Sequence, residues 1–262
     1  MIRVLTLVAG VSLVVCLACF AGMSVVGGPE LFHGTWAHNW RVHDGSVTFD
    51  NNFTPDFDGG GPQETRTLAW TGATSLNVEI PADVQFTQAP GPGKLVITGP
   101  KGTVDQIELN GGKLDYVREP DDAQKVTVVM TAPNVTRFAL DGEGSIGIAA
   151  YDQDQLELDL SGDGRLSAAG KAHKLKLSIS GDGGADLAKL AAEDADVSID
   201  GDGHATIAPT ISANLNISGD GEINLASHPA SVRSDVSGDG QIIEGGETAQ
   251  SSNSVASSRE RP

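Results

Sequence analysis

A four-residue glycine-rich motif recurs six times in the second half of the chain at nearly constant spacing. The first glycines of consecutive copies are 18 to 20 residues apart. A fixed period near 20 residues is typical of stacked structural repeats, in which each unit packs on its neighbours. The six copies are Asp141-Gly-Glu-Gly144, Ser161-Gly-Asp-Gly164, Ser180-Gly-Asp-Gly183, Asp200-Gly-Asp-Gly203, Ser218-Gly-Asp-Gly221 and Ser237-Gly-Asp-Gly240.

Apolar and polar residues alternate on both sides of each motif. A period of two indicates a β-strand with one buried face, and it argues against helical repeats. We therefore predict an all-β fold: a single-stranded parallel β-helix with coils of about 19–20 residues, stacked about 4.8 Å apart. We expect right-handed winding, the default for parallel crossovers. Equivalent residues then form internal stacks, one of which is Leu158, Leu177, Val197 and Leu215.

The same alternation predicts where the residues of each motif point. Both glycines are expected to face inward at a sharp bend, where a side chain does not fit. The leading Ser or Asp and the central acid are expected to face outward. A second corner is predicted seven residues after the first glycine, where a small residue fits a tight bend: Ala149, Ala169, Ala188, Ala208 and Ala226.

The central acids are the candidate functional residues of the repeat. One reading is that Asp and Gly are good turn formers whose side chains cap nearby amides. The other is a calcium site along an external row of carboxylates, because like charges at this spacing repel by roughly 1 kcal/mol in water. The predicted calcium ligands are Asp163, Asp182, Asp202, Asp220 and Asp239; no other metal or cofactor is expected.

The N-terminus predicts export. Arg3 precedes an uncharged and mostly apolar run over residues 4–26, and no further Lys or Arg occurs until Arg41. A positive start and this length fit a signal peptide or a transmembrane signal anchor. Cleavage, retention in the membrane and lipidation at Cys19 remain open. Cys16 and Cys19 are the two cysteines of the chain, so no disulfide framework supports the exported part.

Composition changes divide the chain into four parts. Residues 1–27 are the signal or anchor segment, and residues 28–65 are a flexible connector rich in Gly, Asp and Asn. Residues 66–245 are the β-helix, with irregular coils over 66–140 and regular coils over 141–245. The irregular part is expected to supply a cap, because a bare β-helix end invites aggregation. Residues 246–262 form a disordered serine-rich tail.

Several segments resemble one bacterial family. Leu76-Asn-Val-Glu-Ile80 and Val84-Gln-Phe-Thr-Gln88 resemble its opening strands, and Lys113-Leu-Asp-Tyr116 resembles a middle strand. Val126-Thr-Val-Val-Met-Thr-Ala-Pro-Asn134 resembles its T-A-P segment, and the Gly-Asp-Gly motifs resemble its glycine turns. The chain is similar to the "putative auto-transporter adhesin, head GIN domain" family (DUF2807). This resemblance implies a right-handed β-helix in the cell envelope, and adhesion is implied only by analogy of fold.

Two function classes follow. The first is a non-catalytic, adhesin-like scaffold, exported to the periplasm or cell surface of a bacterial envelope, that binds a glycan or an envelope protein. The alternative is a polysaccharide-active enzyme on a pectin-lyase-like β-helix. Short coils over 141–245 predict no walled cleft, and Tyr151 is the one aromatic residue of that region. A net charge of −18 argues against nucleic acid as a partner. No catalytic residue is predicted.

Overall fold

A computed structural model describes residues 41–43, 46–48, 62–245 and 247–249. The chain divides into two units, Met1–Asp58 and Gly59–Pro262. In the first unit, β1 (Arg41–His43) and β2 (Ser46–Thr48) form an antiparallel pair. The predicted membrane segment at 4–26, most of the connector and most of the tail lie outside the described residues. Within the described part of the chain, no helix is long and apolar enough to cross a membrane.

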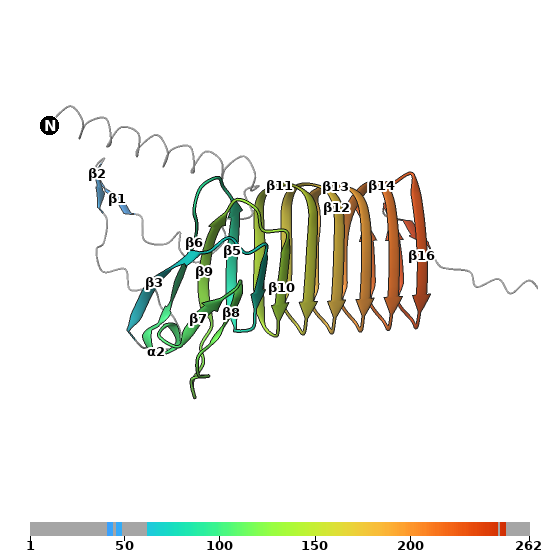
Figure 1. Ribbon diagram of the computed structural model, residues 1–262. Helices are drawn as coiled ribbons and strands as arrows, with labels where there is room; N and C mark the ends of the chain where they lie inside the picture. The colour runs from blue at the N-terminus through green and yellow to red at the C-terminus, as the bar shows by residue number, and fades with distance from the viewer. Residues whose placement is uncertain (1–40, 44–45, 49–61, 246, 250–262) are drawn as a thin grey trace, which may run out of the picture. The chain divides into compact units, whose positions relative to one another are not determined.

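The second unit confirms the predicted β-helix. It is a solenoid of about five turns that is almost entirely β-structure (Figure 1). The regular coils are four long bent strands that pair in parallel. They are β11 (Gly144–Ser161), β12 (Arg165–Ser180), β13 (Gly184–Asp200) and β14 (His204–Ser218). The next coil consists of β15 (Glu222–Leu225) and β16 (Ser231–Ser237), and β17 (Gln241–Glu244) pairs with β15 as the start of a further coil.

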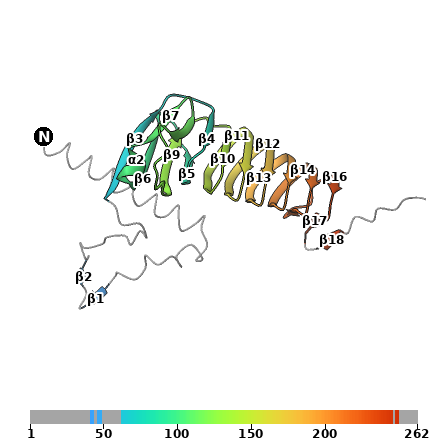
Figure 2. The same cartoon turned by 90° about the horizontal axis from the view of Figure 1, so that it is seen from below.

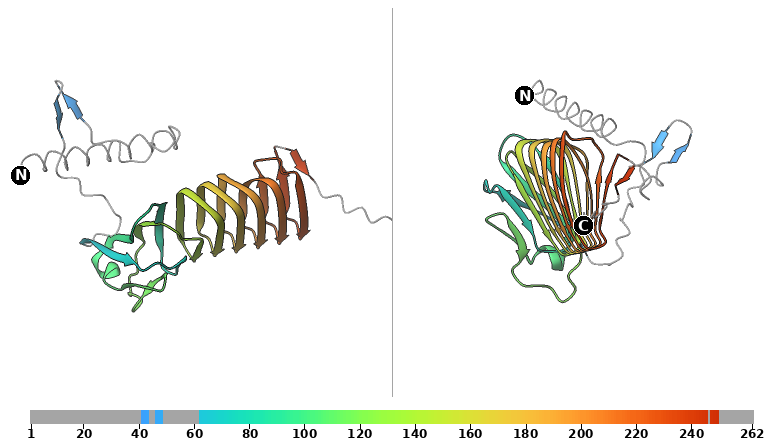
Figure 3. Two further views of the ribbon diagram at one scale, coloured as in Figure 1. Left: turned by 45° about the horizontal axis from the view of Figure 1, so that its top comes forward. Right: turned by 90° about the vertical axis from the view of Figure 1, so that its right-hand side faces the viewer.

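Each long strand crosses two parallel sheets, which we call sheet A and sheet B. Sheet B contains the residues that follow each motif, and sheet A contains the residues that precede the next motif. A view along the axis shows the coils lying over one another (Figure 3). The long strands change register where they bend between the sheets, for example between Ile148 and Tyr151. A short third side connects the two sheets at this bend.

The core is a set of internal rows that run along the axis. The predicted stack is confirmed, because Leu158, Leu177, Val197 and Leu215 are register partners and are at most 1% exposed. Leu76 and Phe138 extend this stack toward the N-terminal end. Aliphatic residues supply nearly all of the rows, which explains how so few aromatic residues suffice.

The second corner differs from the expectation. The predicted alanines lie near the register shifts, but their side chains are exposed or half-buried. The interior at the first of these corners is filled by Tyr151, which is 1% exposed and donates its hydroxyl to Gln155 O. The preceding residue, Ala150, has a φ of 54°. The alanines therefore lie on the outer side of the bend. Lack of space in the core does not explain why these residues are small.

The N-terminal end is built from shorter elements that finish both sheets. In sheet B, β5 pairs in parallel with β9, and β6 and β3 then add antiparallel strands. In sheet A, β10 pairs in parallel with β4, β4 with β8, and β7 forms an antiparallel hairpin with β8. The sequence predicted irregular coils over 66–140, but it predicted neither β3, which begins within the expected connector 28–65, nor these antiparallel pairings. The elements are β3 (Gln63–Trp70), β4 (Ser75–Val78), β5 (Ala82–Gln88), β6 (Gly93–Pro100), α2 (Lys101–Val104), β7 (Ile107–Asn110), β8 (Lys113–Tyr116), β9 (Val126–Ala132) and β10 (Arg137–Asp141).

The C-terminal end finishes the two sheets differently. Sheet B gains an antiparallel strand, β18 (Glu247–Ala249), on β17. Sheet A ends in β16, which pairs with β14 alone among the described residues. Figure 2 shows β16, β17 and β18 together at this end, opposite the end formed by β3, β6, β7 and α2.

Candidate binding surfaces of the solenoid

The first glycine of each motif allows the corners of successive coils to stack closely. Gly219 has a φ of 124°, and a Cβ atom there would lie 2.6 Å from Gly201 O. The amide of Gly219 donates to Ser237 O of the next coil at 2.8 Å. These first glycines are half-buried in the regular coils, so the prediction that they face inward is wrong. Positive φ and close approach along the axis are what require glycine.

The second glycine of each motif does face inward, as predicted. Gly164 is buried, and a Cβ atom there would lie 2.6 Å from Leu140 Cδ2 and 2.9 Å from Leu160 Cδ1. The equivalent Gly203 would meet Ile179 Cγ2 at 2.7 Å. The large side chains of the internal row therefore occupy the space that a second side chain would need. The first residue and the central acid of each motif are exposed, which also agrees with the prediction.

The central acids form an exposed row along the corner between sheets A and B. Asp163, Asp182, Asp202, Asp220 and Asp239 each occupy the same position of consecutive coils. Over the described ranges, no group of three or more His, Cys, Asp or Glu side chains is arranged to hold a metal ion. The arrangement is a row of single carboxylates, one per coil. Calcium binding along it stays a prediction.

One half of the outer face of sheet A carries ion pairs between neighbouring coils, one of which reaches Asp159 at the border with the other half. Arg137 Nη2 lies 2.8 Å from Asp159 Oδ2, and Lys176 Nζ lies 2.8 Å from Glu157 Oε1. The hydrogen bond from Lys176, together with the nearby Arg137, lowers the pKa of the Glu157 carboxyl. The same hydrogen bond raises the pKa of Lys176. Exposed ion pairs of this kind contribute little to the free energy of unfolding. They place opposite charges next to one another on adjacent coils.

The other half of this face, next to the acidic corner, carries short polar side chains. We call it the serine strip, and it has two rows in register. At its N-terminal end lies a hollow of about 290 Å³, where Asn77 Oδ1 is buried without a hydrogen-bond partner. The strip thus offers at least one hydroxyl group at each coil, with carboxylate or amide groups at most of them. Its residues are Asp159, Ser178, Ser198, Asn216 and Asp235 in one row and Ser161, Ser180, Asp200, Ser218 and Ser237 in the other.

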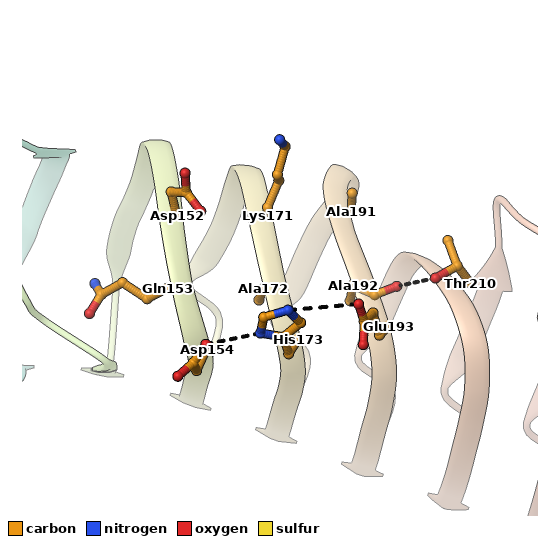
Figure 4. Close-up of a pocket in the computed structure, with 10 residues that line it drawn as sticks. All are labelled: Asp152, Gln153, Asp154, Lys171, Ala172, His173, Ala191, Ala192, Glu193 and Thr210. Carbon is orange, nitrogen blue, oxygen red and sulfur yellow. Dashed lines mark hydrogen bonds and ion pairs between the residues drawn. The ribbon is translucent and has the colours of Figure 1, made fainter.

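The third side of the solenoid has a hollow of about 320 Å³ with a histidine at its centre (Figure 4). His173 Nδ1 lies 2.9 Å from Asp154 Oδ1, and His173 Nε2 lies 3.7 Å from Glu193 Oε1. All three side chains are at least half exposed. Sequence analysis missed this cluster, although Asp154, His173 and Glu193 are 19 and 20 residues apart. Aligning the coils residue by residue would have found it.

The other two histidines of the solenoid do not join this cluster. The His204 ring lies over Gly184 in sheet B, where glycine leaves room for it. The His228 ring lies against Gly245 at the C-terminal end. The histidines therefore occupy three separate places. The hollows on sheet A and on the third side are open and are lined by both polar and apolar residues, and such surfaces suit contacts with a large partner better than enclosure of a small one.

Comparison with known structures and families supports this fold. A profile of the family described as "Putative auto-transporter adhesin, head GIN domain" matches residues 74–229, more than half of the chain. The search of curated proteins found no match. A "putative adhesin" from Bacteroides fragilis has 20% sequence identity and a TM-score of 0.56, over 71% of this chain and 98% of that chain. At this identity the likeness concerns the fold.

Two further solved structures are more distant. A "putative adhesin" from Parabacteroides merdae has 18% identity and a TM-score of 0.45, over 71% of this chain and 97% of that chain. A "putative lipid binding protein" from Parabacteroides distasonis has 16% identity and a TM-score of 0.42, over the same shares. Neither likeness is close enough to carry an argument about function. The family match over residues 74–229 and the observed coils agree, and the chain belongs to the head GIN domain family.

Proposed function

We propose that the protein is an exported, non-catalytic scaffold of the bacterial cell envelope that binds a glycan chain along the serine strip. The observation that carries this proposal is the regular pair of polar rows on sheet A, repeated at every coil. Glycans present hydroxyl groups at regular intervals, and hydroxyl, amide and carboxylate side chains are their natural hydrogen-bond partners. The family description as an adhesin supports the same class of function.

The geometry favours an extended ligand over a compact one. Strip residues are separated by one coil spacing, about 4.8 Å. The ion-paired half of sheet A borders the strip on one side, and the acidic corner borders it on the other. A polymer lying parallel to the axis would contact several coils at once, so weak contacts would add up. Anchoring in the membrane through residues 4–26 belongs to this proposal, because it would hold the solenoid outside the cytoplasm.

A glycan array with the full chain in detergent solution tests the proposal, followed by titration of the best glycan. Ser178→Gln and Ser198→Gln place longer side chains in the strip and should weaken binding about tenfold or more. Ser167→Gln makes the same change on the outer face of sheet B and should leave binding unchanged. Equal losses in all three variants, or no glycan bound, would contradict the proposal.

The same assay separates the alternatives. Shortening of a bound polysaccharide over time would establish the enzyme reading. Capture of an envelope protein, without any glycan, by wild type and not by Ser198→Gln would place a protein partner on the strip. Export is tested separately by protease treatment of intact spheroplasts, in which the proposal predicts cleavage of the solenoid part from outside.

A further inference from the structure

The C-terminal end of sheet A is an open strand edge. Within the described residues, β16 pairs on one side with β14 and on the other side with nothing. It is the last strand of the row at the right-hand end of Figure 1. An unpaired strand edge presents N–H and C=O groups that readily pair with another strand.

The backbone groups that face this open edge can be assigned. Ser237 O accepts a hydrogen bond from Gly219 N at 2.8 Å, so the Ser237 carbonyl faces β14. Along a parallel ladder, successive residues bond alternately to the two neighbouring strands. Val232, Ser234 and Val236 have the opposite parity to Ser237. Their N–H and C=O groups therefore point toward the open edge.

The inward side chains of β16 also differ from those of the earlier coils. Ser234 is the register partner of Leu215 and ends the internal stack with a polar residue. Val232 is 37% exposed and Val236 is half-buried, whereas their partners Ala213 and Ile217 are at most 3% exposed. The inner face of β16 thus presents one partly exposed valine on either side of Ser234.

The sequence of β16 is complementary to itself in the antiparallel direction. It reads Ser-Val-Arg-Ser-Asp-Val-Ser, with Ser234 at its centre. An antiparallel pair centred on Ser234 places Val232 opposite the partner's Val236 and Arg233 opposite the partner's Asp235. Parallel pairing in register would instead place like charges together. Opposite charges across a strand pair stabilise it, and like charges destabilise it.

The pattern of free backbone groups fits the same register. Val232, Ser234 and Val236 would each face a residue whose N–H and C=O also point across the edge, so that each pair exchanges two hydrogen bonds. Arg233 and the partner's Asp235 would occupy a non-hydrogen-bonded pair, where side chains lie closer together. One register therefore satisfies the backbone, the apolar residues and the charges together.

We propose that two copies of the chain associate end to end by antiparallel pairing of β16 with β16, about a twofold axis at Ser234. Both open edges are used in this contact, so the assembly closes as a dimer. Sheet A and its serine strip then continue across both copies. The net charge of −18 on each copy opposes the contact at low ionic strength, and physiological salt screens this repulsion.

Sedimentation velocity of the full chain in detergent solution at physiological salt tests the proposal. Wild type should show a monomer–dimer equilibrium. Arg233→Asp and Asp235→Arg each turn both charge pairs into like-charge contacts and should raise the dimer Kd about tenfold or more. The double variant Arg233→Asp with Asp235→Arg restores opposite charges and should restore dimerisation. Arg165→Asp, the same charge change on sheet B, should leave the Kd unchanged.

A backbone variant gives an independent test. Ser234→Pro removes an N–H that faces the open edge and spares the bonds between β16 and β14, so it should abolish the dimer with an unchanged circular dichroism spectrum. If this variant misfolds, the Arg233 and Asp235 charge variants test the proposal instead. The proposal is overturned if wild type stays monomeric, if the charge variants associate like wild type through another surface, or if the double variant fails to recover.

Discussion

The two ends of the solenoid are finished in different ways. At the N-terminal end, antiparallel strands β3 and β6 extend sheet B, the β7–β8 hairpin extends sheet A, and Val104 of α2 is buried against this end. At the C-terminal end, within the residues that the structure describes, β18 extends sheet B and sheet A ends in β16. The N-terminal end consists of about 80 residues of irregular structure, 62–140. At the C-terminal end, polar and charged residues in the single strand β16 take the place of such a cap.

This difference shows two solutions to one problem. An exposed parallel edge with an apolar inner face promotes aggregation. The N-terminal end covers its core, so that Leu95 and Ile97 of β6 are fully buried. The C-terminal end replaces the inner leucine with Ser234 and places Arg233 and Asp235 on the edge strand. The first solution buries the core under added strands, of which β3 and β7 have one partner each among the described residues, and the second leaves a polar edge that the proposed β16 pairing would use.

The largest expected effect compares a corner within the stack with the corner that begins it. Gly219→Ala should destabilise the protein by about 3 kcal/mol or more, because its Cβ atom would meet Gly201 O in addition to the cost of positive φ. Gly142→Ala has the same cost of positive φ but no atom within 4 Å of its Cβ, and should cost about 1 kcal/mol. Urea unfolding measures both. Equal losses of stability in the two variants would show that close contact between successive coils is not what requires glycine at this position.

A second pair of variants compares valines at the two ends. Val128 in β9 is fully buried, so Val128→Ala should cost about 2–3 kcal/mol. Val232 in β16 is 37% exposed, so Val232→Ala should cost less than about 1 kcal/mol in the monomer. Unfolding at low protein concentration is the appropriate measurement. A loss at Val232 as large as that at Val128 would mean that the C-terminal end is covered.

The acidic corner gives a smaller effect that depends on salt. Asp182 has an acidic neighbour in the coil on each side, whereas Asp239 has one neighbour, Asp220. Asp182→Asn should raise the melting temperature at low salt, by the equivalent of about 1 kcal/mol or less, and Asp239→Asn should raise it about half as much. High salt should remove both gains. A fall in melting temperature would show that the carboxylates cap the turns.

The predicted calcium row can be tested with these variants. If calcium bridges the acids, millimolar calcium should raise the melting temperature of wild type more than that of the combined Asp182→Asn and Asp202→Asn variant. Magnesium at the same ionic strength is the control for screening. Equal responses of wild type and variant would contradict calcium binding.

The smallest effect concerns the ion pairs on sheet A. The pKa of Glu157 is lowered in the folded state, so its contribution is complete above the unfolded pKa of about 4.3 and is lost as pH falls through the folded pKa. Glu157→Gln should therefore cost less than about 1 kcal/mol at pH 7, and this cost should disappear near pH 3. Urea unfolding across this range measures the difference. A cost that persists at low pH would indicate lost packing.

Much of the solenoid could be predicted because its determinants are local. The spacing of the motifs gave the coil length, and alternation gave the inward rows, including Leu158 and Leu215. The role of Gly219 was harder to predict, since its close approach to Gly201 is along the axis and the alternation within one coil contains no information about it. A positive φ is likewise invisible to a count of inward and outward positions.

The N-terminal end and the surface clusters depended on contacts that local pattern does not specify. Irregular coils over 66–140 were predicted, but alternation is identical for parallel and antiparallel pairing, so the antiparallel pairing of Leu95 with Met130 was not. The cluster at His173 is not visible within one coil, because its neighbours Asp154 and Glu193 lie in adjacent coils. The antiparallel self-complementarity of the β16 sequence predicts pairing between two copies only if the edge of β16 is open, and the sequence alone does not show this.

Hydrogen exchange at β16 tests most directly the claim that the C-terminal end of sheet A is an open edge at which two copies pair. The amide of Ser234 should exchange rapidly in the dilute monomer and slowly at concentrations where dimers form. The amide of Leu215, its partner in the previous coil, should exchange slowly at every concentration. Slow exchange of Ser234 in the dilute monomer would show that another part of the chain covers this edge, and would contradict the account.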